Sequence, residues 1–144
     1  MYFTIERTVQ HSDSRRERTR SAHRTVVMML SSFNTPIWFY PEPVNFRSQI
    51  DGLVILASDA LEKDPCSGEL FIFRNRSANK IKLLWYDRNG FWLCYKRLEK
   101  GRFKFPSQDA IALELSRDQL NWLLSGLDML KQRVQPSHRA SHFY

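Results

Sequence analysis

Several residue types that would mark a metal site, a disulfide-rich fold or a membrane protein are scarce in this sequence. Its two cysteines, Cys66 and Cys94, form neither a metal-ligand spacing nor a disulfide framework. No apolar run approaches the roughly 20 residues of a membrane span, and Met1 begins no secretory signal pattern. The four histidines all lie near the chain ends: His11, His23, His138 and His142. We therefore expect no metal site, no cofactor and a cytoplasmic location.

Catalytic motifs are also missing. The sequence has no nucleophile elbow, no phosphate-binding loop and no cysteine–histidine partnership. Asp51, Asp87 and Glu99 could in principle hold two metal ions, as in a three-carboxylate nuclease site. However, Asp51 falls in a predicted helix and the other two fall in predicted turns, which favours structural roles. The sequence thus predicts a protein that is not an enzyme.

Charge is distributed unevenly along a chain whose composition is otherwise globular. Of 144 residues, 42% are hydrophobic and 13% aromatic, and the formal net charge is +7. Residues 71–105 carry ten lysines and arginines against two acidic residues, whereas residues 34–70 carry two against six. Such a concentration of positive charge favours an acidic partner, of which nucleic acid is the leading candidate.

The chain divides into three parts by its pattern. The stretch HSDSRRERTRSAHRT (11–25) is polar, charged and without an apolar period, so we expect residues 1–33 to be a disordered extension. Natural translation starting at Met28 or Met29 is a sharper version of this prediction. Residues 34–130 are predicted to form one domain, and residues 131–144 a flexible tail.

The first half of this domain reads as a strand and a helix. A short strand is predicted over 36–40, stopped by Pro41 and Pro43. Asn45 can cap a helix that begins with Phe46 and ends at Asp64-Pro65. Apolar residues at helical spacing give it one buried stripe: Phe46, Ile50, Leu53, Val54, Ala57 and Leu61.

The second half reads as an antiparallel β-meander followed by a helix. Apolar alternation predicts strands over 70–73, 80–86, 91–97 and 102–105, with Asn89-Gly90 as a tight hairpin turn. Ser116 and Gln119 form a capping box at the start of a C-terminal helix. The predicted fold class is α+β, a single domain in which an antiparallel β-meander packs with an N-terminal and a C-terminal helix.

One stretch resembles a known family. The elements DPCSGELFIF, NGFWL and KRLEKGRF occur in order, and the similarity runs from about Ile37 to Leu127. In this combination they resemble the TnpB (second open reading frame) accessory proteins of insertion-sequence family sixty-six. That family often has Asp-x-Arg-Lys where this chain has Asn45-Phe46-Arg47-Ser48. The departure removes one carboxylate and one lysine, while asparagine still caps a helix.

The resemblance implies an accessory protein needed for transposition of a bacterial element. Its implied partners are DNA at the element ends, the transposase and the small partner protein of the same element. The catalytic step would then belong to the larger partner.

The predicted sheet supplies the candidate contact surface. With a two-residue loop at Asn89-Gly90, Lys82 would lie opposite Arg97, and such like charges need an acidic residue or a phosphate nearby. We predict nucleic-acid binding by Arg74, Arg76, Lys80, Lys82, Lys96, Arg97, Arg102 and Lys104, and a partner contact by Arg47, Tyr86 and Tyr95. An acidic protein surface, or plain solvated charge, remains an alternative reading of the basic row. The runner-up function is an adaptor that binds the transposase or the small partner without touching DNA.

Overall fold

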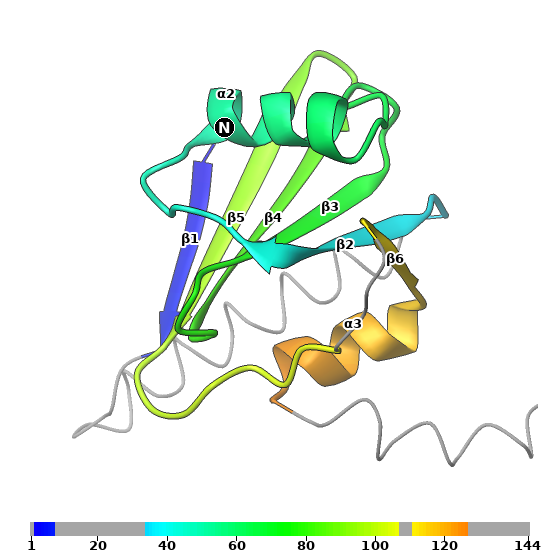
Figure 1. Cartoon of the computed structure of the whole chain (residues 1–144). Coiled ribbons are helices and arrows are strands. Elements are labelled where there is room, and N and C mark those ends of the chain that lie inside the picture. Colours follow the sequence, from blue (N-terminus) through cyan, green and yellow to red (C-terminus); the bar gives the residue numbers. More distant parts are fainter. Residues whose placement is uncertain (1, 8–33, 107–110, 127–144) are drawn as a thin grey trace, which may run out of the picture.

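A single sheet runs through the molecule. The computed structural model describes residues 2–7, 34–106 and 111–126, and in these ranges six strands form one sheet in the order β1-β5-β4-β3-β2-β6 (Figure 1). The strands are β1 (Tyr2–Arg7), β2 (Ile37–Pro43), β3 (Leu70–Arg74), β4 (Lys80–Asp87), β5 (Gly90–Leu98) and β6 (Leu113–Leu115). Together with the helices on its faces, this sheet confirms the predicted single-domain α+β class.

The central strands β3, β4 and β5 form the predicted antiparallel meander, with one correction in register. Asp87 pairs with Gly90, so the two-residue turn is Arg88-Asn89 and not Asn89-Gly90. Lys80 rather than Lys82 therefore lies opposite Arg97. This register brings together two cross-strand aromatic pairs, which stabilise it: Trp85 stacks on Trp92, and Tyr86 packs edge-on against Phe91. A shift of two residues changes the cross-strand partners but not the face of the sheet on which each side chain lies.

The predicted strand over 102–105 is not a strand. After Gly101, whose φ of 80° suits glycine, the chain passes the end of the sheet without joining it. Phe103 is buried, and its N–H donates to the carbonyl of Ala78 (2.7 Å). Phe105 stacks on Phe39 at 5.2 Å between ring centroids. Packing of the two phenylalanines thus explains the alternation that we had assigned to a strand.

β2 is longer than predicted and makes the sheet mixed. It pairs parallel to β3 and antiparallel to β6, and it continues through Pro41 to Pro43. The ladder shifts between Phe39 and Pro43, because prolines cannot donate to it. The carbonyl of Pro41 instead accepts a hydrogen bond from Nε of Arg74 (2.7 Å).

The first helix starts later and ends earlier than predicted. It consists of α2 (Ile50–Ile55) and a π-helical continuation, η1 (Leu56–Ala60). Asn45 does not cap it: its Oδ1 accepts from the N–H of Arg47 (2.9 Å), which makes a turn before the helix. The helix ends before Glu62, whose φ is 54°.

The C-terminal helix α3 (Arg117–Leu124) begins with the predicted capping box. Oγ of Ser116 accepts from the N–H of Gln119 (3.1 Å), and Oε1 of Gln119 accepts from the N–H of Ser116 (2.8 Å). Both hydrogen bonds of the predicted capping box are therefore present.

The helices lie on opposite faces of the sheet, which gives three layers (Figure 1). One core lies under α2 and η1, built from Leu53, Ala57, Leu61, Phe71, Phe73, Leu84 and Leu93. The other lies against α3 and includes Ile37, Phe39, Ile72, Leu83, Trp85, Leu120 and Leu123. Fully burying one such side chain contributes roughly 1.5–3 kcal/mol. β3, buried on both faces, links the two cores.

Neither edge strand was predicted. β6 pairs with β2 over three residues, and β1 pairs with β5 in a region where the sequence indicated no structure. The rest of the predicted extension and the predicted tail lie outside the described residues. In the described part, no helix is both long enough and apolar enough to span a bilayer.

Candidate nucleic-acid interface

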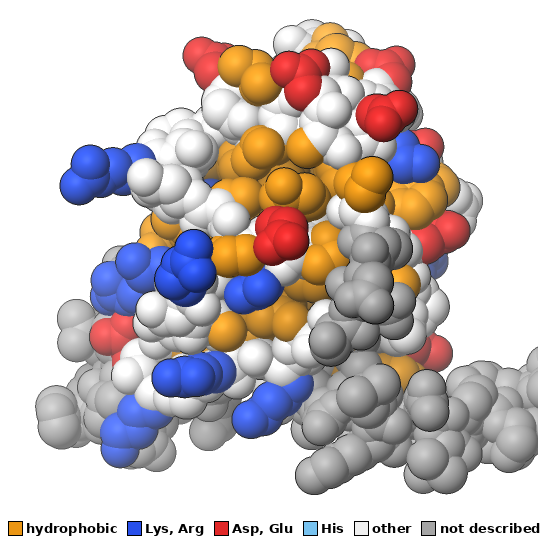
Figure 2. All heavy atoms as spheres, in the orientation of Figure 1, with side chains coloured by type: hydrophobic (Ala, Val, Ile, Leu, Met, Phe, Trp, Pro, Cys, Tyr) orange, Lys and Arg blue, Asp and Glu red, His pale blue; other side chains and the backbone are white. Residues whose placement is uncertain are grey.

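Exposed basic side chains gather at the end of the sheet where β3 ends, β4 begins and β5 ends. The meander brings these strand ends together, and the chain after β5 stays beside them. The N–H of Leu98 donates to the carbonyl of Asn79 (2.8 Å), as that of Phe103 does to Ala78. Of the cations in these segments, we call five the basic end: Arg76, Lys80, Lys100, Arg102 and Lys104. In Figure 2 most basic side chains of the visible face lie toward the lower left.

The turn between β3 and β4 is held in place by the Asn75 side chain. Its Oδ1 accepts from the N–H groups of Asn79 (3.1 Å) and Lys80 (3.0 Å), and its Nδ2 donates to Oδ1 of Asn79 (2.6 Å). Ala78 completes the turn with a φ of 60°. Arg76 is therefore presented on a preorganised turn, which lowers the entropy lost when it binds a partner.

Four members of the basic end are exposed and Lys80 is half-buried. Within the described ranges, none of the five side chains is hydrogen-bonded or ion-paired to another residue. Their charges are thus available to an anion from outside. Lys100 was not among the predicted residues, because it falls in a turn where no strand alternation marks it.

Two predicted contact residues are inside the protein. Lys82 is 1% exposed, and its Nζ donates to the backbone carbonyls of Phe46 (3.1 Å) and Ser48 (2.7 Å). Burial lowers the pKa of Lys82, and the like charge of Lys80 lowers it further. Lys96 is 7% exposed and its Nζ donates to the carbonyl of Leu124 (2.7 Å). Lys82 thus holds the segment before α2 against the sheet, and Lys96 holds the end of α3. Because both side chains are buried, neither belongs to the candidate surface.

Lys82 also lies close to two aromatic rings. Its Nζ is 4.8 Å from the ring centroid of Phe46 and 5.5 Å from that of Tyr95. Such contacts with the faces of aromatic rings stabilise a cation that has no ion pair with any described carboxylate. The ammonium thus ties the segment before α2 to the sheet.

Two further predicted arginines lie at the same end of the sheet but already have partners. Arg74 donates to Pro41 and to the carbonyl of Asn75 (3.3 Å), and it lies over the ring of Phe105. Nε of Arg97 is 2.7 Å from Oε2 of Glu99. These two arginines add positive charge beside the basic end, but the side chain of each already has a partner within the domain.

The predicted partner contacts Arg47, Tyr86 and Tyr95 do not form one surface. Arg47 is exposed in the turn before α2. It therefore lies outside the helix, which was predicted to begin with Phe46 but begins at Ile50. Tyr86 lies near the far end of β4 against Phe91, whereas Tyr95 lies mid-strand with its ring edge-on to Phe46 (5.9 Å).

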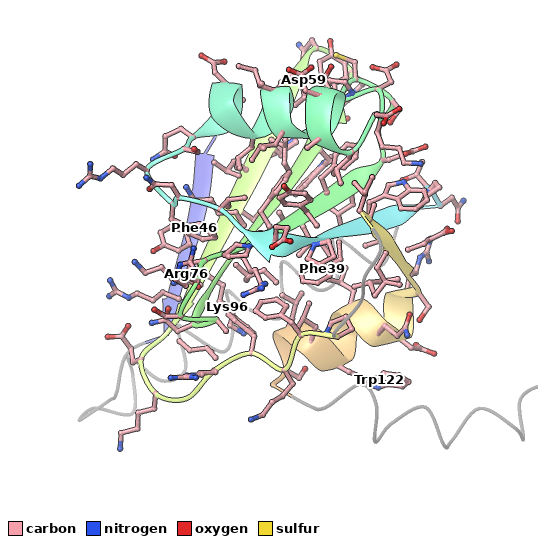
Figure 3. All side chains as sticks on the ribbon, in the orientation of Figure 1. Phe39, Phe46, Asp59, Arg76, Lys96 and Trp122 are labelled. Atoms are coloured by element: carbon pink, nitrogen blue, oxygen red, sulfur yellow. The ribbon has the colours of Figure 1, made fainter. Side chains whose placement is uncertain are left out.

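Acidic side chains prevail away from the basic end. Asp51, Asp59, Glu62 and Asp64 are all exposed on α2, η1 and the loop that follows. Figure 3 shows Asp59 at the top of the view and Arg76 well below it, on the left. The uneven charge of the sequence thus gives the folded domain an acidic region around α2 and η1 and a separate positive region at the basic end.

The candidate nuclease carboxylates are dispersed. Asp87 accepts from Nε1 of Trp92 (3.2 Å) at one end of β5, Glu99 pairs with Arg97 at the other, and Asp51 lies on α2. Over the described ranges, no group of three histidine, cysteine or acidic side chains is placed to hold a metal ion. The four histidines lie outside those ranges.

Comparison with known proteins adds to this geometry. A family model described as IS66 Orf2 like protein matches residues 35–134. Two proteins of Sinorhizobium fredii (strain NBRC 101917 / NGR234) are similar. Uncharacterized protein y4hO is 37% identical over 101 residues, which cover 70% of this chain and 88% of that protein. Uncharacterized protein y4jC is 36% identical over 98 residues, covering 68% and 84%. No solved structure matches the chain significantly.

Proposed function

The chain belongs to the IS66 Orf2-like family, and we propose that it contacts DNA through the basic end as a non-catalytic part of a transposition complex. Family membership implies a transposition-associated accessory protein, and the family is not a known catalytic one. The proposal adds the direct partner and the contact surface. The partners are DNA at the element ends, the transposase and the small partner protein.

The observation that carries the proposal is the set of five cations at one end of the sheet whose side chains have no partner among the described residues. Three separate segments supply them: the locked β3–β4 turn, the start of β4 and the chain after β5. Lysine and arginine at such a surface neutralise phosphates and release counterions, an interaction that does not depend on base sequence. A fixed arrangement of cations fits the regular phosphate spacing of a duplex better than a mobile one.

The test is fluorescence anisotropy with a labelled duplex of the element end and a shuffled duplex. The variant Arg102→Glu/Lys104→Glu reverses two charges of the basic end. Its matched control, Arg47→Glu/Arg88→Glu, changes the net charge equally at other places. Arg88 directly follows β4, and Lys80 begins that strand roughly 26 Å away.

We expect the basic-end variant to lose at least tenfold in affinity, because each reversal removes a phosphate contact and adds a repulsion. The control should retain most of its affinity, and both variants should keep the wild-type circular dichroism spectrum. Equal losses in the two variants would show a general charge effect and remove the basic end from the proposal.

The adaptor function is the second candidate, and the exposed acidic residues on α2, η1 and the loop that follows favour it. Ile55 is 58% exposed on α2 and lies one helical turn from Asp51 and from Asp59. If the wild-type protein does not bind DNA at low salt, the adaptor function becomes the better account. Co-purification of the transposase with the wild-type chain, lost on Ile55→Glu, would then support it.

A further inference from the structure

β1 differs from the other strands in how it is attached. It pairs parallel to β5 from Tyr2 opposite Leu93 to Arg7 opposite Leu98, and among the described strands it has no other neighbour. Residues 8–36 separate it from β2, which lies four places away in the strand order. Removing β1 would therefore break no other strand pair of the described sheet.

The edge that β1 covers belongs to the family domain, whereas β1 itself does not. The family match covers residues 35–134, which include all of β5 but begin after β1. Without β1, the outward N–H and C=O groups of residues 93–98 would form an open edge that can accept a strand. Exposed edges of this kind bind extended peptides by strand addition.

We propose that this edge of β5 is a docking site for an extended segment of a partner protein, and that β1 is an intramolecular occupant with which the partner competes. The register defines the chemistry of the segment. It runs parallel to β5, with apolar residues at the positions that Tyr2, Phe3 and Ile5 hold. It carries a carboxylate opposite Arg97, the position of Glu6.

A second copy of the chain is a poorer occupant than a separate partner. It would offer the same strand without the tether, and a tethered strand acts at an effective concentration on the order of millimolar. At micromolar protein concentration, the edge of β5 is therefore occupied by β1 of the same chain and not by β1 of another copy. A partner can displace β1 when it is held near this edge in the same complex. Its apparent affinity equals its intrinsic affinity multiplied by the fraction of molecules in which β1 has left the edge.

The test uses a labelled synthetic peptide of residues 1–9 as a stand-in for the partner segment. The full-length variant Thr4→Pro/Ile5→Pro disables the internal strand. Alternate residues of a parallel strand direct their N–H to the neighbour, so one of two consecutive prolines must remove a ladder hydrogen bond. Amide hydrogen exchange in β3 and β4 checks that the rest of the sheet is intact.

We expect the proline variant to bind the peptide saturably and the wild-type chain to bind it at least tenfold more weakly. A Glu6→Lys peptide should bind less well than the natural one, because like charges then lie opposite each other at Arg97. Equal binding of a scrambled peptide, no binding to the folded variant, or equal binding to wild type and variant would overturn the proposal.

A second variant tests the proposal if the double-proline chain does not fold. The full-length Glu6→Lys chain keeps every backbone donor and should bind the natural peptide more tightly than wild type does. Dimers of either variant that the peptide cannot dissociate would also count against the proposal, because they would make a second copy the preferred occupant.

Discussion

Replacement of Lys82 by methionine removes the ammonium that joins the segment before α2 to the sheet. Methionine keeps much of the side-chain volume, so the change isolates the hydrogen bonds to Phe46 and Ser48. A hydrogen bond to a charged group contributes about 1.5–3 kcal/mol. The desolvation of a buried ammonium, several kcal/mol, offsets part of this gain. We expect a net loss of about 1–3 kcal/mol in the free energy of unfolding.

The pH dependence of this loss has a definite sign. Because burial lowers the pKa of Lys82, the unfolded chain binds more protons than the folded one between the lowered pKa and the ordinary lysine value. The stability of the wild-type protein therefore rises with pH across that window. A neutral amine still donates two hydrogen bonds, so both contacts survive. The methionine variant lacks this rise, and its deficit should grow as the pH increases.

Urea denaturation of both proteins across an alkaline pH series measures this prediction. Lys80→Met is the matched control: it lies on the same strand, is half-buried and removes the same charge. We expect it to change the stability by less than about 0.5 kcal/mol. Amide exchange should become faster in residues 44–53 of the Lys82 variant. A Lys82→Met protein as stable as wild type, with unchanged exchange there, would refute the anchoring account.

Three further predictions concern the helices and cysteines. Lys96→Met should cost about 1–3 kcal/mol in urea denaturation, because the carbonyl of Leu124 loses its buried donor; an unchanged midpoint would contradict this. Ser116→Ala should cost about 1 kcal/mol through loss of the capping box, measured as a lower thermal midpoint. Burial raises the pKa of Cys94 to about 12, so at pH 8 a thiol reagent should modify exposed Cys66 first, and Cys94 only after unfolding.

The sequence was sufficient where a local pattern decides the structure. The capping box at Ser116 and the apolar alternation of β3 to β5 depend on neighbouring residues, and both predictions hold. The hairpin turn was misplaced by one residue, because pairing of Trp85 with Trp92 favours a different register. Local turn chemistry at Asn89-Gly90 could not reveal that cross-strand preference.

Contacts distant in sequence could not be predicted. Nothing in the alternation of Lys82 or Lys96 shows that a carbonyl 36 or 28 residues away accepts from its amino group. The parallel pairings of β1 and β2 likewise join segments that no local pattern connects. The basic segment was recognised from charge, but which of its cations are exposed depends on these distant partners.

The salt dependence of DNA binding tests the central claim most directly. If all five cations of the basic end contact phosphates, log K against log salt should have a slope of about −4.5, a roughly 500-fold loss of affinity between 50 and 200 mM salt. Arg102→Glu/Lys104→Glu should make that slope shallower by about 2, whereas Arg47→Glu/Arg88→Glu should leave it unchanged. A wild-type protein that does not bind DNA, or a slope that both variants reduce equally, would contradict the account.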